Sequence, residues 1–151
     1  MPKVVICDTS SLILLHKVGE LHILNLVYGD IFTTKEVADE FVEKLPYWIH
    51  IEAAKDKKYQ QFLATKLDLG ESNAMALAQE MDDSLLILDD LKARKLAKQL
   101  NLIFTGTLGV IHKAKQDGKI AMVKPIIDKL LKTNFRISKQ VVEEILKKNN
   151  E

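Results

Sequence analysis

Two short runs of apolar residues in this chain lead directly into aspartates. Val4-Val5-Ile6 runs through Cys7 into Asp8, and the run 85–88 leads into Asp89 and Asp90. A short aliphatic or β-branched run bounded by turn formers is typical of a buried strand. If both strands belong to one open parallel sheet, these aspartates lie at the carboxyl edge, where ligands bind in such sheets.

The rest of the chain alternates between helical and strand-like segments. Capping boxes at Thr33/Glu36 and Asp68/Glu71 predict two helix starts, and Ser138 predicts a third. This alternation predicts an α/β fold, a three-layer α/β/α sandwich with a mainly parallel central sheet. We predict strands over 3–7, 30–33, 47–51, 85–88 and 102–104, and helices over 10–17, 20–28, 34–44, 54–66, 72–81, 91–100, from the 105–109 turn to about 118, 122–132 and 139–148.

Length and composition predict one globular domain over residues 1–151. The chain is long enough for a substantial core, and 47% hydrophobic residues argue against disorder. No apolar run reaches the length of a membrane span, and the N-terminus lacks a secretory pattern. We therefore expect a cytoplasmic protein with no membrane partner. The single cysteine, Cys7, excludes an intrachain disulfide.

The net charge of +1 hides an uneven distribution of charge. Residues 1–90 carry a net charge of −8, whereas residues 91–151 carry +9. An acidic half suited to cations and a basic half suited to polyanions fit a nuclease. Solvated helix faces and a basic C-terminal helix explain the same distribution equally well.

Four acidic positions stand out as candidates for chemistry. Asp8 ends the first strand, Glu40 lies on a helix, Glu71 opens another helix, and Asp89 or Asp90 ends the 85–88 strand. Each has an ordinary structural explanation, such as an Asx turn, a solvated helix face or a helix cap. Gathered at one sheet edge, however, they would repel one another and would need a cation or protons.

A series of motifs covers nearly the whole chain in a fixed order. They are Asp8-Thr-Ser10, Glu40 in the segment 36–41, Gly70-Glu71-Ser-Asn-Ala74, Asp89-Asp90-Leu-Lys-Ala-Arg94 and Gly106-Thr-Leu-Gly109. In this order they resemble the PIN domain family, the fold of the VapC-type toxin ribonucleases, and within it a prokaryotic PIN-like branch of unknown function. The chain departs from typical VapC proteins where Glu71 replaces an aspartate and where Asp89-Asp90 replaces a Thr-x-Asn-type segment.

The resemblance implies a Mg²⁺- or Mn²⁺-dependent endoribonuclease. Asp8, Glu40, Glu71 and either Asp89 or Asp90 would hold the metal, and a metal-activated water would attack an RNA phosphodiester. Because Asp89 and Asp90 are adjacent, the alignment does not choose between them.

Further residues of the motifs have supporting roles. Ser10 would hydrogen-bond a carboxylate or a metal-bound water, or would cap the helix that follows it. Arg94 and Lys92 lie near the expected metal edge and could contact the RNA backbone. Thr107 either begins a phosphate-binding helix N-terminus or caps an ordinary strand–helix turn.

The expected partners are RNA, an antitoxin protein if the chain is the toxin of a toxin–antitoxin pair, and a second copy in a homodimer. The alternative is a PIN-like module with weak or no catalysis that binds RNA or a protein. A phosphatase of the haloacid dehalogenase type is disfavoured, because it needs a second aspartate where this chain has Ser10.

Overall fold

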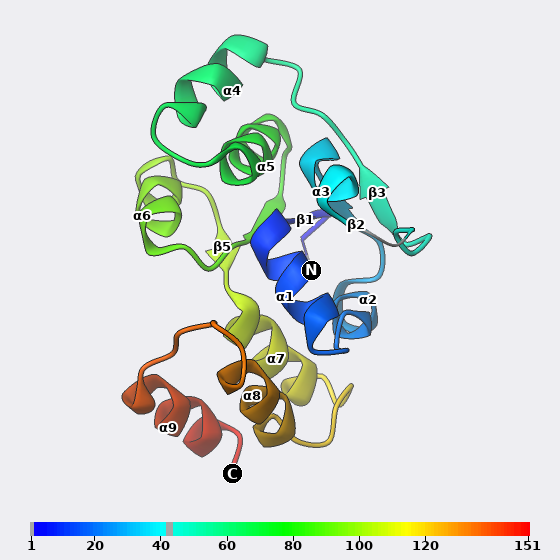
Figure 1. The fold of residues 1–151 in the computed structure, drawn as a ribbon, viewed down its shortest axis with the longest axis vertical. Helices are drawn as coiled ribbons and strands as arrows, with labels where there is room; N and C mark the ends of the chain where they lie inside the picture. The colour runs from blue at the N-terminus through cyan, green and yellow to red at the C-terminus, as the bar shows by residue number, and fades with distance from the viewer. Residues whose placement is uncertain (1, 42–43) are drawn as a thin grey trace.

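The computed structural model describes residues 2–41 and 44–151. Within them, five strands form one parallel sheet in the order β3-β2-β1-β4-β5 (Figure 1). The strands are β1 (Val4–Cys7), β2 (Ile31–Thr33), β3 (Ile49–Ile51), β4 (Ser84–Ile87) and β5 (Phe104–Thr105).

Helices join the strands and extend the chain beyond the last strand. Among the described residues they are α1 (Thr9–Lys17), α2 (His22–Tyr28), α3 (Lys35–Glu40), α4 (Lys57–Ala64), α5 (Leu69–Glu80), α6 (Leu91–Gln99), α7 (Thr107–Gln116), α8 (Lys124–Leu131) and α9 (Lys139–Lys148). None of these helices is long and apolar enough to cross a membrane.

Alternation along the central strands supplies both faces of the sheet with apolar side chains. Val5 and Cys7 of β1 belong to one buried cluster, whereas Ile6 belongs to the other. In β4, Ile87 and Leu86 divide in the same way. Successive strand residues point to opposite faces, so a continuous apolar run is what a doubly covered strand requires.

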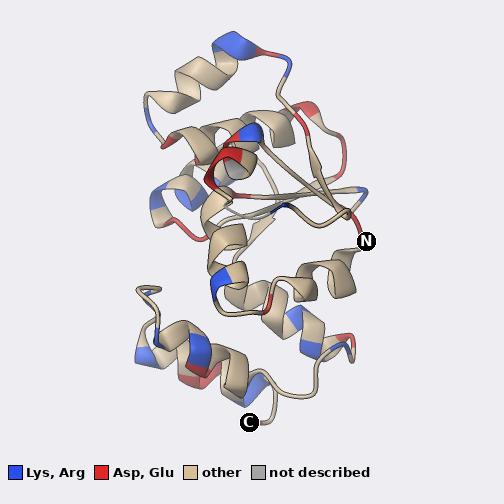
Figure 2. Ribbon diagram, turned by 45° about the vertical axis from the view of Figure 1, so that its right-hand side comes forward, with Lys and Arg blue, Asp and Glu red and all other residues tan. Residues whose placement is uncertain are grey.

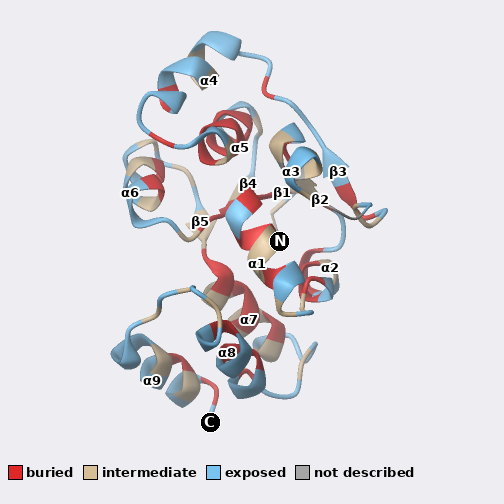
Figure 3. Ribbon diagram, viewed as in Figure 1, coloured by how far each residue is buried: buried red, intermediate tan, exposed pale blue. Residues whose placement is uncertain are grey.

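The two clusters define the outer layers. Residues of α1, α2, α7, α8 and α9 pack in the cluster that contains Val5, and residues of α4, α5 and α6 pack in the cluster that contains Ile6. Helix α5 is buried over eight successive residues, 71–78, and appears as a mostly buried helix in Figure 3. The three-layer α/β/α sandwich predicted from the sequence is therefore confirmed.

The pairing of β1 with β4 brings the two aspartate-bearing strand ends together. Val4 aligns with Ser84 and Cys7 with Ile87, and the ladder continues where the Asp8 amide donates to the Ile87 carbonyl at 3.0 Å. The expectation that these strands are neighbours in one sheet is confirmed. Asp8 and Asp89 consequently leave the same edge of the sheet.

The capping predictions had mixed outcomes. Asp68 and Glu71 form the predicted capping box of α5, and Ser138 caps α9. The prediction that Thr33 caps α3 is wrong, because Thr33 lies inside β2 and its hydroxyl donates to the Cys7 carbonyl at 2.9 Å. The helix predicted to reach residue 44 ends at Glu40, and residues 42–43 lie outside the described part of the chain.

Several element boundaries also differ from the prediction. The helix predicted over 54–66 is the shorter α4, which Asp56 caps by accepting from the Tyr59 amide. The 47–51 strand begins only at Ile49, and the 102–104 strand is displaced to Phe104–Thr105. β5 pairs directly with β4, but its displacement does not alter the pairing of β1 with β4, so the aspartate-bearing edge is unchanged.

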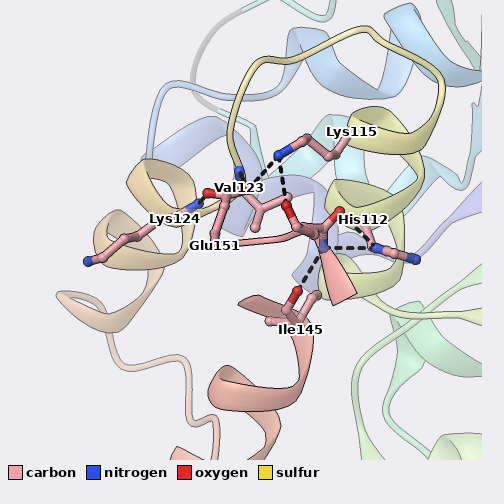
Figure 4. Close-up of polar contacts among 7 residues, drawn as sticks. His112, Lys115, Val123, Lys124, Ile145 and Glu151 are labelled. Atoms are coloured by element: carbon pink, nitrogen blue, oxygen red, sulfur yellow. Dashed lines mark hydrogen bonds and ion pairs between the residues drawn. The ribbon is translucent and has the colours of Figure 1, made fainter. Parts of the chain in front are cut away.

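The C-terminal helices are fastened to one another by polar contacts (Figure 4). The Glu151 carboxylate accepts from Lys115 Nζ at 2.8 Å and from the backbone amides of Val123 and Lys124, both at 2.9 Å. Asn149 Nδ2 lies 2.9 Å from His112 Nδ1 and donates to the Ile145 carbonyl at 2.7 Å. These bonds link the end of α9 to α7 and to the start of α8.

Candidate metal and nucleic-acid site

Four of the helices that begin at the carboxyl edge of the sheet have an aspartate at their N-terminus. Asp8 precedes α1, Asp68 precedes α5 and Asp90 precedes α6. Helix α7 begins at Thr107, and its first amide donates to Asp89. The positive ends of helix dipoles favour negative charge, so this edge can gather several carboxylates.

Three of these aspartates serve as helix caps. Asp68 Oδ1 accepts from the Glu71 amide at 2.8 Å, and Asp90 Oδ2 accepts from the Ala93 amide at 2.9 Å. Asp89 Oδ1 accepts from the Thr107 amide at 2.8 Å, from the neighbouring strand connection. Each carboxylate thus satisfies a backbone donor that the first turn of a helix leaves free.

Asp8 is different, because its carboxylate caps nothing. The residue is 2% exposed, and neither carboxylate oxygen has a hydrogen-bond partner among the described residues. The hydroxyl of the adjacent Thr9 is likewise buried without a partner. Burying polar atoms without partners is unfavourable, so the buried Asp8 side chain lowers the stability of the fold.

Burial is the main cause that raises the pKa of Asp8, to about 7. The carboxylates of Glu71, Asp68 and Asp89 raise it further, in that order after burial. The Thr9 amide opposes the rise without reaching normal hydrogen-bond geometry. The shift shows that these carboxylates lie close enough to repel one another.

Glu71 shares this environment at the start of α5. Burial raises its pKa to about 7, with further contributions from the carboxylates of Asp68 and Asp90. Its Oε1 lies 3.4 Å from the Asp68 amide, a long contact that completes the capping box. Glu71 is therefore both a cap partner and a member of the carboxylate cluster. Together, five acidic residues form a carboxylate cluster: Asp8, Asp68, Glu71, Asp89 and Asp90.

Asp89 is the most firmly held carboxylate of the cluster. Thr107 donates to it twice, from its amide at 2.8 Å and from its hydroxyl at 2.6 Å, and the Ser11 hydroxyl donates at 3.1 Å. Asp90 accepts from the Ala93 amide through Oδ2, and Oδ1 has no hydrogen-bond partner among the described residues. Asp89 is thus fixed in orientation, whereas Asp90 keeps an oxygen available for another contact.

Two glycines allow the elements around the cluster to approach closely. A Cβ at Gly70 would lie 2.7 Å from the Thr9 hydroxyl and 3.5 Å from Asp8 Oδ1. A Cβ at Gly106 would collide with the Arg94 guanidinium and lie 2.7 Å from Asp89 Oδ1. Both glycines belong to the motifs noted in the sequence. The lack of room for a side chain explains why glycine occupies these two positions.

The remaining sequence candidates lie around the cluster in different ways. Glu40 is exposed at the last residue of α3, and the pKa shifts of Asp8 and Glu71 are caused first by burial and then by carboxylates other than Glu40. Ser10 is exposed on α1 and lines the groove described below, but Asp8 occupies the N-cap position of α1. Thr107 orients Asp89 and is not a helix cap, because Gly106 occupies the N-cap of α7.

Arg94 and Lys92 are separated although they share helix α6. Arg94 Nε donates to the Leu88 carbonyl at 3.0 Å, and its guanidinium lies 5.5 Å from the centre of the Phe104 ring. Arg94 therefore supports the connection that carries Asp89. Lys92 is exposed and lines a separate groove between α6 and the connection from α4 to α5.

Sequence reasoning missed three residues of the site. Asp68 was identified only as a cap, although its charge contributes to the shifts of Asp8 and Glu71. Ser11 was overlooked in favour of Ser10, although only the third position of α1 reaches Asp89. Arg136, in the connection between α8 and α9, had no local motif that could have revealed it.

A groove of about 480 Å³ opens beside the carboxylate cluster. It lies between the starts of α1, α5 and α6 on one side and the α8–α9 connection on the other. The view in Figure 2 shows Lys and Arg residues along the C-terminal helices. The lining residues are Ser10, Leu14, Asp68, Glu71, Asp89, Asp90, Leu91, Asn134, Phe135 and Arg136.

The donor atoms of the cluster suit a hard divalent cation. Carboxylate oxygens are preferred by Mg²⁺, and the two bare oxygens of Asp8 are the atoms that would gain from a cation. Among residues 2–41 and 44–151, no group of three or more His, Cys, Asp or Glu side chains is arranged to hold one ion. One or two carboxylates completed by water and phosphate oxygens remain compatible with this geometry, as is usual for Mg²⁺.

Comparison with known proteins places the chain in a family. The family model DUF3368, described as a PIN domain, matches residues 4–151, and the chain therefore belongs to the PIN domain family. No curated protein and no solved structure matches the chain significantly. PIN domains are generally nucleases that use divalent metal ions, and PIN domain proteins commonly bind RNA and antitoxins.

Proposed function

We propose that this protein is a Mg²⁺- or Mn²⁺-dependent endoribonuclease whose active site is the carboxylate cluster. The observation that carries the proposal is the bare, buried carboxylate of Asp8 at the carboxyl end of the central strand. Three neighbouring carboxylates raise its pKa, so the cluster is a site of unbalanced negative charge. A hard cation would balance that charge.

The residues of the cluster would have two roles, which are binding the ion and fixing the position of a carboxylate beside it. Asp8 and Glu71 would hold the ion directly, and the free oxygen of Asp90 would reach it through a water. Asp89 would keep its position through Thr107 and Ser11. A bound Mg²⁺ or Mn²⁺ supplies Lewis-acid stabilisation of phosphate charge and lowers the pKa of a coordinated water. Glu40 belongs to this proposal through the family motif, as an additional carboxylate from α3.

Cleavage of an RNA pool tests the proposal. We expect wild-type protein to shorten a mixed single-stranded and structured RNA pool with Mg²⁺ or Mn²⁺, and EDTA to stop cleavage. Asp8→Asn should lower the rate by at least about 100-fold, because it removes the central charge that holds the metal. Salt-dependent RNA binding should be retained, since Asp8 does not contact the phosphate backbone.

Asp82→Asn is the matched control for the cleavage experiment. Asp82 is exposed and precedes β4, at the strand end opposite Asp89. The control should cleave at the wild-type rate. Equal residual activity in wild type and Asp8→Asn would point to a contaminating nuclease and contradict the proposal.

The alternative function is a PIN-like module that binds RNA or a protein partner without cleaving. The buried Asp8 argues against it, because a module without catalysis gains nothing from an unpaired buried carboxylate. RNA binding without cleavage under any divalent ion would favour this alternative. An antitoxin partner, a homodimer and a cytoplasmic location stay predictions.

A further inference from the structure

A second groove, of about 510 Å³, continues from the groove beside the carboxylate cluster. The two grooves share Asp89, Leu91, Phe135 and Arg136. The second groove runs between the start of α7 and the α8–α9 connection, which lies beside α7 in Figure 1. The two grooves therefore form one continuous path that passes the cluster.

Arg136 stands where the two grooves meet. It is exposed, and its guanidinium makes no ion pair with a carboxylate in the described parts of the chain. Arg94, the other cation lining the path, already donates to the Leu88 carbonyl. Arg136 is thus the cation beside the cluster whose donors are available to a ligand.

The second groove has a mainly apolar lining beyond Arg136. Leu91 is 81% exposed at the first position of α6, an unusual placement for a leucine next to a charged cluster. Leu108, Ile137 and Val141 continue the apolar surface. An apolar surface next to one guanidinium that is unpaired within the described residues suits a single nucleotide. The base can pack on the apolar side chains, and the guanidinium can bind two phosphate oxygens at once.

We propose that Arg136 binds the phosphate next to the scissile one and that the adjoining nucleoside packs on Leu91 in the second groove. The proposal rests on the proposed function, since it places the RNA strand relative to the carboxylate cluster. The ligand is a single strand: each of its bases can leave the stack and lie against protein, which paired bases cannot do. Arg136 is a binding residue and takes no part in the chemical step.

Fluorescence anisotropy with a labelled oligouridylate, at several salt concentrations and without divalent metal, tests the proposal. Arg136→Ala should weaken binding about tenfold at low salt, as expected for one charge-assisted phosphate contact. The slope of log K against log salt should fall by about 0.7, the value for one phosphate on a single strand. Leu91→Ala should weaken binding about threefold and leave the slope unchanged, because it removes an apolar contact.

Two further variants separate a specific contact from general charge. Arg136→Lys should restore the slope but only part of the affinity, since lysine keeps the charge and loses the bidentate fork. Lys148→Ala removes the same charge from an exposed position at the far end of α9, about 15 Å along the helix from Ser138. It should change neither affinity nor slope by much, so equal effects of Arg136→Ala and Lys148→Ala would overturn the proposal.

Cleavage kinetics keep the failure of this proposal distinct from failure of the proposed function. Arg136→Ala should raise KM about tenfold and change kcat little, because the phosphate contact is uniform in the ground and transition states. Normal metal-dependent cleavage with an unchanged KM would overturn the role of Arg136 while the nuclease function stands. If the wild type never cleaves RNA but Arg136→Ala still binds it more weakly than Lys148→Ala does, the result supports the role of Arg136 and contradicts the nuclease function.

Discussion

Two buried carboxylates in this protein have opposite surroundings. Asp8, at the carboxyl edge of the sheet, is 2% exposed, and within residues 2–41 and 44–151 neither of its oxygens has a hydrogen-bond partner. The Glu151 side chain, between the C-terminal helices, is 5% exposed and accepts hydrogen bonds from Lys115, Val123 and Lys124. Burial alone raises the pKa of either group, but at Glu151 these bonds outweigh it and lower the pKa to about 2.

The difference distinguishes a buried carboxylate that stabilises the fold from one that destabilises it. Glu151 accepts from one ammonium group and two backbone amides and joins α9 to α7 and α8, so its burial stabilises the fold. Asp8 faces carboxylates and one poorly placed amide, so its burial destabilises the fold until a cation or a proton arrives. A buried charge that the fold leaves unpaired is better explained by ligand binding than by structure.

The largest expected effect on stability comes from neutralising Asp8. Without divalent metal at pH 8, Asp8→Asn should raise the Tm by about 5 °C, because it removes repulsion within the carboxylate cluster. Saturating Mn²⁺ should stabilise the wild type by mass action, by about 2.7 kcal/mol at 100-fold its Kd, and should stabilise the variant much less. Thermal melts in EDTA and in Mn²⁺ measure both effects.

The pH dependence of this gain has a definite sign. The pKa of Asp8 is raised to about 7 from an ordinary value of 3.8, so the folded protein holds this proton more tightly than the unfolded chain. Stability from this group is present at low pH and declines as pH rises from about 4 towards 7. The advantage of Asp8→Asn should therefore vanish near pH 4, and an advantage that grows at low pH would contradict our account. Asp82→Asn should show neither effect.

Breaking the contact at Glu151 should have the opposite sign. Glu151→Gln should destabilise the fold by about 2 kcal/mol at pH 7, because it weakens charge-assisted bonds to Lys115 and two amides. The lowered pKa means that this stabilisation is present above about 4.5 and is lost as pH falls towards 2. Urea unfolding at pH 7 and pH 3 measures the change.

The neighbouring Glu143 provides the control for Glu151. It lies exposed on α9, so Glu143→Gln should leave the free energy of unfolding within about 0.5 kcal/mol of the wild type. At a temperature where both variants are folded, each should cleave RNA at the wild-type rate. A large loss of cleavage in Glu151→Gln would show that the two regions are coupled, and the contrast drawn above would then fail.

The sheet and its aspartate-bearing edge could be predicted from the sequence because short-range rules determine them. The run Val4–Cys7 and the residues preceding Asp89 are apolar on both faces, which only a doubly covered strand requires. The Asp68 capping box is equally local. Thr33 misled the prediction because its hydroxyl has a partner in another strand, Cys7, that no local pattern reveals.

The details of the site depend on contacts between distant segments. Ser11 lies 78 positions from Asp89, and helix phase alone does not show whether it or Ser10 faces that carboxylate. Arg136 lines the groove beside the cluster because the α8–α9 connection lies beside α7. The sequence thus predicted in outline the acidic residues near Asp8. It did not predict which of their carboxylates accept hydrogen bonds and which have no partner.

The smallest expected effect distinguishes Ser11 from Ser10. Ser11→Ala removes one of three donors to Asp89, and the two bonds from Thr107 remain. The variant should lose about 1 kcal/mol of stability and about threefold in cleavage rate, since Asp89 keeps most of its orientation. Ser10→Ala is the matched control, because Ser10 is exposed on the same turn of α1. It should retain wild-type stability, and a larger loss in Ser10→Ala than in Ser11→Ala would show that Ser10, as the sequence motif suggests, is the serine that serves the carboxylates.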